Sequence, residues 1–133
     1  MICSAFCLML ILASCLGKPE EHVTEVKNSA FKILVRSQEF HHSGTVIVDV
    51  CVAEASDSEF PEKRIQCLLR GDDFSGLSVK WLSQREIEIS FACGTVSSFR
   101  HYAVVSPSGS LPQEFHAILN DRCESLAGDA PRG

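Results

Sequence analysis

Cysteine is the residue type in this chain with the widest range of chemistry, because a thiol can form a disulfide, ligate a metal ion or be alkylated. The chain has seven cysteines in 133 residues. They stand at positions 3, 7, 15, 51, 67, 93 and 123. The first three fall within an apolar stretch at the amino end, and the other four are spread through the more polar remainder. The two groups therefore need separate explanations.

The first seventeen residues, MICSAFCLMLILASCLG, contain no charged side chain, and residues 6–12 form an apolar run. This run has the length of the hydrophobic region of a signal peptide and is shorter than the roughly 20 apolar residues of a membrane-spanning helix. The charged residues that begin at Lys18 end it abruptly. Although the usual Lys or Arg near the start is missing, the pattern predicts export with cleavage.

The apolar run ends in Leu12-Ala13-Ser14-Cys15, which resembles the lipobox of bacterial lipoproteins. In that family the chain is cut immediately before the cysteine, whose thiol carries a diacylglycerol. The resemblance implies a signal peptide over residues 1–14 and an N-terminal lipid on Cys15 that holds the protein on a membrane. Leu16, rather than Asp, follows Cys15, which by the same resemblance implies the outer membrane, facing the periplasm. The alternative is ordinary secretion after cleavage at Gly17.

The remaining cysteines, Cys51, Cys67, Cys93 and Cys123, are separated by 16, 26 and 30 residues. No Cys-x-x-Cys pair occurs among them, so the spacing typical of zinc sites is absent. An even number of cysteines in an exported domain predicts two disulfides, for which three connectivities exist. We favour Cys51 with Cys67 and Cys93 with Cys123, because neighbours in a meander lie close together. Free buried thiols are the alternative.

Patterns of known catalytic sites are missing from the sequence. There is no Gly-x-Ser-x-Gly elbow, no phosphate-binding glycine loop and no His-Glu-x-x-His helix. We therefore predict a domain that is not an enzyme and holds no cofactor and no metal. The alternative is a small secreted or anchored hydrolase that draws its site from His101, Asp72, Asp73 and Ser75.

Three aromatic residues, Phe40, Phe60 and Phe74, lie in polar or glycine-flanked connections. Aromatic side chains that share one rim of a stable scaffold form protein-binding surfaces. The sequence thus offers these three residues as a candidate binding surface. The alternative is that each loop folds its phenylalanine back onto the core.

Alternation of apolar and polar residues predicts the strands that must position these groups. The clearest hairpin joins residues 77–81 to 87–93, and residues 71–76, GDDFSG, read as a turn. Residues 113–119 fit either a strand, which we favour, or one short C-terminal helix. The other predicted strands cover residues 31–36, 45–53, 64–70 and 99–105.

About six strands in sequence order predict a mainly β fold, because consecutive strands usually pair and helices for crossovers are missing. We expect a single small antiparallel meander closed into a barrel or a sandwich. This β-domain would cover residues 30–123. The lipidated Cys15 would begin a flexible tether over residues 15–29, and residues 124–133 would form a flexible tail.

The charge balance excludes nucleic acid as a partner, because 17 acidic residues oppose 12 scattered basic ones and phosphate binding needs a basic face. The anchor and the missing catalytic patterns together predict an envelope lipoprotein. Its β-domain would bind another protein as an inhibitor, an immunity factor or an assembly component. A structural spacer is the further alternative.

Overall fold

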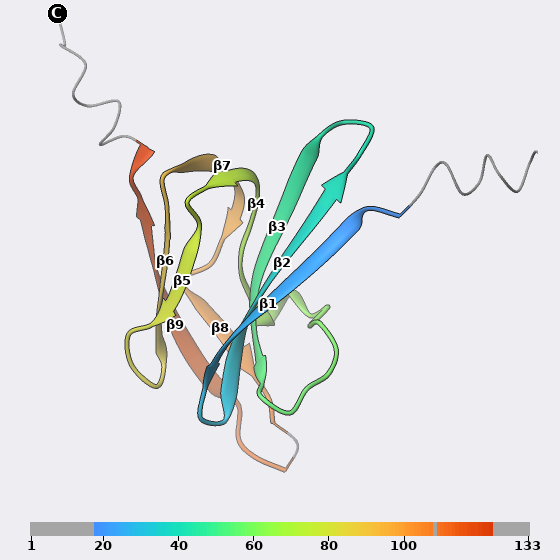
Figure 1. The fold of residues 1–133 in the computed structure, drawn as a ribbon. Coiled ribbons are helices and arrows are strands. Elements are labelled where there is room, and N and C mark those ends of the chain that lie inside the picture. Colours follow the sequence, from blue (N-terminus) through green and yellow to red (C-terminus); the bar gives the residue numbers. More distant parts are fainter. Residues whose placement is uncertain (1–17, 108, 124–133) are drawn as a thin grey trace, which may run out of the picture.

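The computed structural model describes residues 18–107 and 109–123, which contain nine strands and one short 3-10 helix (Figure 1). The predicted mainly β class is thus confirmed. The predicted signal peptide, Cys15 and the tail over 124–133 lie outside the described residues. The elements are β1 (Glu20–Asn28), β2 (Phe31–Phe40), β3 (Thr45–Glu54), η1 (Arg64–Gln66), β4 (Cys67–Ser75), β5 (Ser78–Trp81), β6 (Glu86–Phe91), β7 (Cys93–Phe99), β8 (Tyr102–Val105) and β9 (Gln113–Asp121).

The strands form two sheets that pack as a sandwich (Figure 1). One sheet has the order β1-β2-β3-β4-β7, and the other has the order β5-β6-β9-β8. Alternate apolar residues of each strand point between the sheets, where burial of their area stabilises the fold. In the described part of the chain, no helix is long and apolar enough to cross a bilayer. The core is built from Ile33, Val48, Val50, Val52, Leu68, Leu69, Ile87, Ile89, Ala103, Val105, Phe115 and Ala117.

The expected flexible tether is wrong for Glu20–Asn28, which form strand β1. This strand pairs with β2 along its whole length, from Glu20 opposite Glu39 to Asn28 opposite Phe31. Most of its side chains are exposed, because β1 is an edge strand that buries little on either face. Because backbone pairing with β2 holds this strand, its sequence needs no alternation of apolar and polar residues. The ordered domain therefore begins at Glu20 rather than at residue 30.

The predicted turn over residues 71–76 is also wrong, because β4 continues through Ser75. These residues form a corner at which the chain passes from one sheet to the other. The antiparallel register runs on across it, from Ser75 opposite Cys93 to Ser78 opposite Ser90. The Ala92 N–H bonds the Ser75 carbonyl at 2.8 Å within this corner. Strands β4-β5 and β6-β7 thus form one bent ribbon shared by both sheets (Figure 1).

The sandwich is one of the two forms that we predicted, and the corner divides its strands between the two sheets. The predicted hairpin is confirmed as β5 and β6, but it belongs to the second sheet. Strand β9 lies beside β6 in parallel orientation and pairs with β8 on its other side. The strand expected over 99–105 is divided, since β7 ends at Phe99 and β8 starts at Tyr102. The favoured assignment of the last element as a strand is confirmed by β9.

Trp81 joins the edge strands of the two sheets. Its indole Nε1–H donates to the Val26 carbonyl of β1 at 2.9 Å, and its ring meets Phe115 at a centroid distance of 5.8 Å. We expect Trp81→Ala to lower the free energy of unfolding by about 3–5 kcal/mol, through the lost ring volume. Trp81→Phe keeps most of that volume and should cost about 1–2 kcal/mol, mainly through the lost hydrogen bond.

Chemical denaturation of both Trp81 variants checks these values, with Tyr102→Phe as the control. The Tyr102 side chain is exposed and should change stability by less than about 0.5 kcal/mol. Equal stability of Trp81→Ala and the unaltered protein would show that the ring does not hold the two edges together.

Candidate functional site

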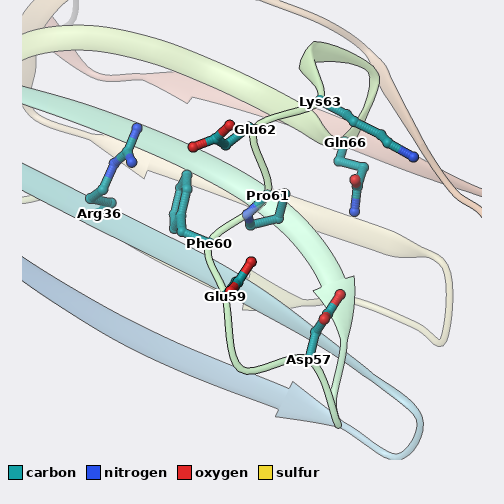
Figure 2. A pocket seen from close by; sticks show the side chains of 8 residues that line it. All are labelled: Arg36, Asp57, Glu59, Phe60, Pro61, Glu62, Lys63 and Gln66. Atoms are coloured by element: carbon teal, nitrogen blue, oxygen red, sulfur yellow. The ribbon is translucent and has the colours of Figure 1, made fainter.

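The connection between β3 and β4, residues 55–66, lies across the outer face of the five-stranded sheet (Figure 2). Side chains on this face would meet solvent if the connection were absent. Instead Lys32, Leu34, Asp49, Cys51 and Ala53 are all buried. Both faces of β3 are therefore covered along its second half. The covering loop gives the sandwich a third layer over one sheet.

Three contacts hold this covering loop in place. The Cys51–Cys67 disulfide joins its two ends across β3 and β4. The buried Lys32 ammonium donates to the Asp57 carbonyl and pairs with the Glu25 carboxylate at 3.0 Å. The Gln66 amide donates to the Val52 carbonyl at 3.1 Å. The loop is therefore fixed near its start, at Asp57, and at its end, at Gln66 and Cys67.

A row of charged side chains crosses the sheet beneath the loop. Arg36, Asp49 and Arg70 stand opposite one another on β2, β3 and β4. The Asp49 side chain is 7% exposed and accepts from Arg36 Nη2 at 2.9 Å and from Arg70 Nη1 at 3.3 Å. Buried carboxylates are stable only when they are paired in this way. One carboxylate thus orders two guanidinium groups on the outer face.

The covering loop meets this row through Phe60. The Arg36 guanidinium carbon lies 4.0 Å from the centre of the Phe60 ring, which is a cation–π contact. Figure 2 shows the ring beside Arg36, with Pro61 and Glu62 following along the loop. Residues 60–62, which we call the ridge, line two adjoining hollows together with Arg36. Phe60 therefore connects the loop to the charged row.

One of these hollows, which we call the arginine groove, has a volume of about 660 Å³. It is defined by four guanidinium groups, those of Arg36, Arg64, Arg70 and Arg100. Phe60 and Pro61 add apolar wall, and Ser98 also lines the groove. Four of the seven arginines of the chain thus gather in one place.

The arginine groove is basic although the chain as a whole is acidic. Its four guanidinium groups face only two carboxylates, those of Asp49 and Glu62. Within residues 18–107 and 109–123, the Arg64 and Arg100 side chains have no ion pair or hydrogen bond. Arginine does not lose its proton in proteins, so these groups offer recognition of anions rather than proton transfer.

Three of the four residues that we considered as a hydrolase site make other contacts in the structure. The His101 ring packs edge-on against Phe99 at 5.0 Å. The Asp73 carboxylate accepts from the Val46 N–H at 3.2 Å, and the Ser75 hydroxyl accepts from the Cys93 N–H at 3.2 Å. In the described ranges, no hydrogen bond or ion pair joins His101 to Asp72, Asp73 or Ser75. The structure does not bring these groups into a catalytic arrangement.

The three phenylalanines proposed as a binding surface have different surroundings. Phe74 packs on the core, where its ring meets Phe91 edge-on at 4.8 Å. Phe40 is half-buried at the end of β2, and its carbonyl accepts from the N–H groups of the following turn. Only Phe60 lines the arginine groove. For Phe74, the structure has the alternative that we named, in which the phenylalanine folds back onto the core.

The favoured disulfide pairing is present, with Cys51 bonded to Cys67 and Cys93 to Cys123. The arginine groove was missed, because its arginines are scattered along the sequence from position 36 to position 100 and are brought together by the strand register and by the path of the covering loop. Comparison with protein-family models, with curated proteins and with solved structures finds no match.

Asp49 is the residue whose loss should disturb the groove most. We expect Asp49→Asn to lower the free energy of unfolding by about 2–3 kcal/mol, because the Arg36 guanidinium would lose its counter-ion in a largely buried place. Chemical denaturation measures the change. Glu114→Gln is the control, since that carboxylate is exposed and pairs only with exposed His116. If both variants unfolded at the same denaturant concentration, the charged row would not stabilise this face.

Proposed function

We propose that this chain is an exported lipoprotein of the bacterial envelope whose β-sandwich binds another protein without catalysing a reaction. Its role would be that of an inhibitor, an immunity factor or an assembly component. The observation that carries the proposal is the arginine groove beside a loop that is fixed at both ends. Arginine and aromatic side chains on a rigid scaffold are the residues that contribute most to protein interfaces. Arg64, Arg100 and Phe60 supply that combination here.

The lipid anchor is the second part of the proposal and rests on the lipobox resemblance at Cys15. Strand β1 begins at Glu20, so only five residue steps separate it from the anchored thiol. An extended chain rises by at most about 3.6 Å per residue, which limits this distance to roughly 18 Å. The anchored sandwich would then stay close to the bilayer surface. We propose the outer membrane, facing the periplasm, with secretion as the alternative.

The two disulfides support export, since such bonds persist in oxidising compartments and are rare in the cytosol. They also support a binding role. Cys51–Cys67 holds the loop that carries Phe60, and Cys93–Cys123 ties the second residue after β9 to the first residue of β7. A surface that is already ordered loses less conformational entropy when a partner binds.

The anchor is tested by Cys15→Ser in the native host. We expect the variant to lose the incorporation of radiolabelled palmitate and to leave the membrane fraction, because serine offers no thiol to alkylate. Cys7→Ser is the matched control and should keep both the label and the membrane location. Palmitate incorporation into Cys15→Ser would show that the anchor is elsewhere. A soluble protein with or without the substitution would favour ordinary secretion.

The binding role is tested by photo-crosslinking in intact cells, with benzoylphenylalanine placed at Glu62 beside the arginine groove. The control position is Lys80, which is exposed on the other sheet. We expect a discrete adduct with a single protein from position 62 and not from position 80. No adduct from position 62, or the same adducts from both positions, would contradict a protein-binding role for this face.

A further inference from the structure

We propose that the arginine groove takes an acidic segment of the partner protein, whose carboxylates pair with Arg64, Arg100 and the free edge of Arg70. The segment's remaining atoms would lie against the Phe60–Pro61 ridge. This inference rests on the proposed protein-binding function and names the chemistry of the partner. Three observations support this inference: the guanidinium groups without partners, the size and lining of the groove, and the contrast between its charge and that of the whole chain.

The first observation is that the groove contains more cationic donors than the described residues satisfy. The two oxygens of Asp49 are each taken by one arginine. Arg70 is 53% exposed in its side chain and gives only Nη1 to Asp49, so the rest of its guanidinium faces outward. Arg64 and Arg100 have no side-chain hydrogen bond or ion pair within the described residues, so the groove favours a ligand that brings acceptor oxygens.

The second observation is the size and lining of the groove. A volume of about 660 Å³ exceeds the space of a single small anion, given that a water molecule occupies roughly 30 Å³ of liquid. Phe60 and Pro61 present apolar surface beside the guanidinium groups. The adjoining hollow has a volume of about 690 Å³, and Lys63 is one of the residues that line it (Figure 2). A peptide segment with carboxylates and aliphatic stems matches this alternation of cation and apolar wall.

The third observation is the contrast with the rest of the molecule. The chain carries a net charge of −5, and the groove combines four guanidinium groups with two carboxylates. An acidic segment is therefore repelled by most of the surface and attracted at this site. Such contrast orients an approaching partner and raises its rate of correct association. The groove thus fits an acidic protein better than a basic or a neutral one.

The test uses the purified full-length lipoprotein in a neutral detergent and follows the fluorescence anisotropy of a labelled hexaglutamate peptide. Arg64→Gln combined with Arg100→Gln removes the two unpaired cations and leaves the Asp49 row intact. Arg85→Gln is the matched control, because Arg85 is exposed in the β5–β6 turn on the other sheet. Thermal unfolding of all three proteins verifies that they are equally folded.

We expect the double variant to bind hexaglutamate about ten- to a hundredfold more weakly, since it loses two charge-assisted contacts that each contribute roughly a factor of three to ten after screening. Arg85→Gln should stay within about twofold, and a hexalysine peptide should not bind. Added salt should weaken binding to the unaltered protein, as for exposed charges. Equal binding by the double variant, or no binding of hexaglutamate to the unaltered protein, would overturn the proposal.

Two competitors separate an acidic segment from other anions. Complete displacement of the peptide by inorganic phosphate at equal concentration would overturn the proposal in favour of a small-anion site. Binding to phosphatidylglycerol vesicles that is lost in the double variant would overturn it in favour of a lipid headgroup. Failure of both competitors, together with the loss in the double variant, supports the acidic segment.

The crosslinking experiment separates failure of this inference from failure of the proposed function. With benzoylphenylalanine at Glu62, the Arg64→Gln, Arg100→Gln protein should lose the adduct that the unaltered arginines allow. An adduct of unchanged yield would overturn the acidic-segment chemistry and leave the protein-binding function standing. If neither protein gave an adduct, the function would fail, while the peptide measurement would still report on the groove.

Discussion

Asp49 is a carboxylate buried on the outer face of a sheet, where it would be unstable without hydrogen-bonding and cationic partners. The arrangement of that face supplies these partners. Arg36 and Arg70 supply the partners from the neighbouring strands. The Arg36 guanidinium then lies over the Phe60 ring and so connects the sheet to the covering loop. Cys51, two residues beyond Asp49 on β3, holds the loop end through Cys67. The charged row, the covering loop and the arginine groove therefore depend on one another.

The parts of the fold that could be predicted are those in which one face of a strand is buried. Alternation identified β2, β3 and the hairpin of β5 and β6 for this reason. Strand β1 gave no such signal, because an edge strand is specified by backbone pairing. The Gly71–Gly76 segment has the composition of a turn, and positive φ angles at Asp73 and Gly76 do bend the chain there. Sequence alone does not distinguish a turn that ends a strand from a corner that passes it to another sheet.

The site was harder to predict than the fold, because it depends on register. The Cys51–Cys67 disulfide agrees with the rule that consecutive strands lie close, which needs no exact alignment, whereas Cys93–Cys123 joins segments that belong to different sheets. The arginine groove needs Arg36, Asp49 and Arg70 to stand in one row, and a shift of one residue would turn each to the opposite face. It also needs a loop to cover that row. Phe60 was identified as an aromatic in a polar loop, but the cation beneath it could not be.

The four arginines of the groove divide by their partners: Arg36 and Arg70 pair with Asp49, whereas Arg64 and Arg100 have no ion pair within the described residues. Arg36 is 22% exposed in its side chain and is engaged by Asp49 and Phe60, so its charge is screened little by salt. Arg64 is exposed, and Arg70 is half exposed, so their attraction for an anion falls as ionic strength rises. The row that holds the loop therefore keeps its strength under conditions that weaken ligand binding. A surface built in this way can release a charged partner without losing its own structure.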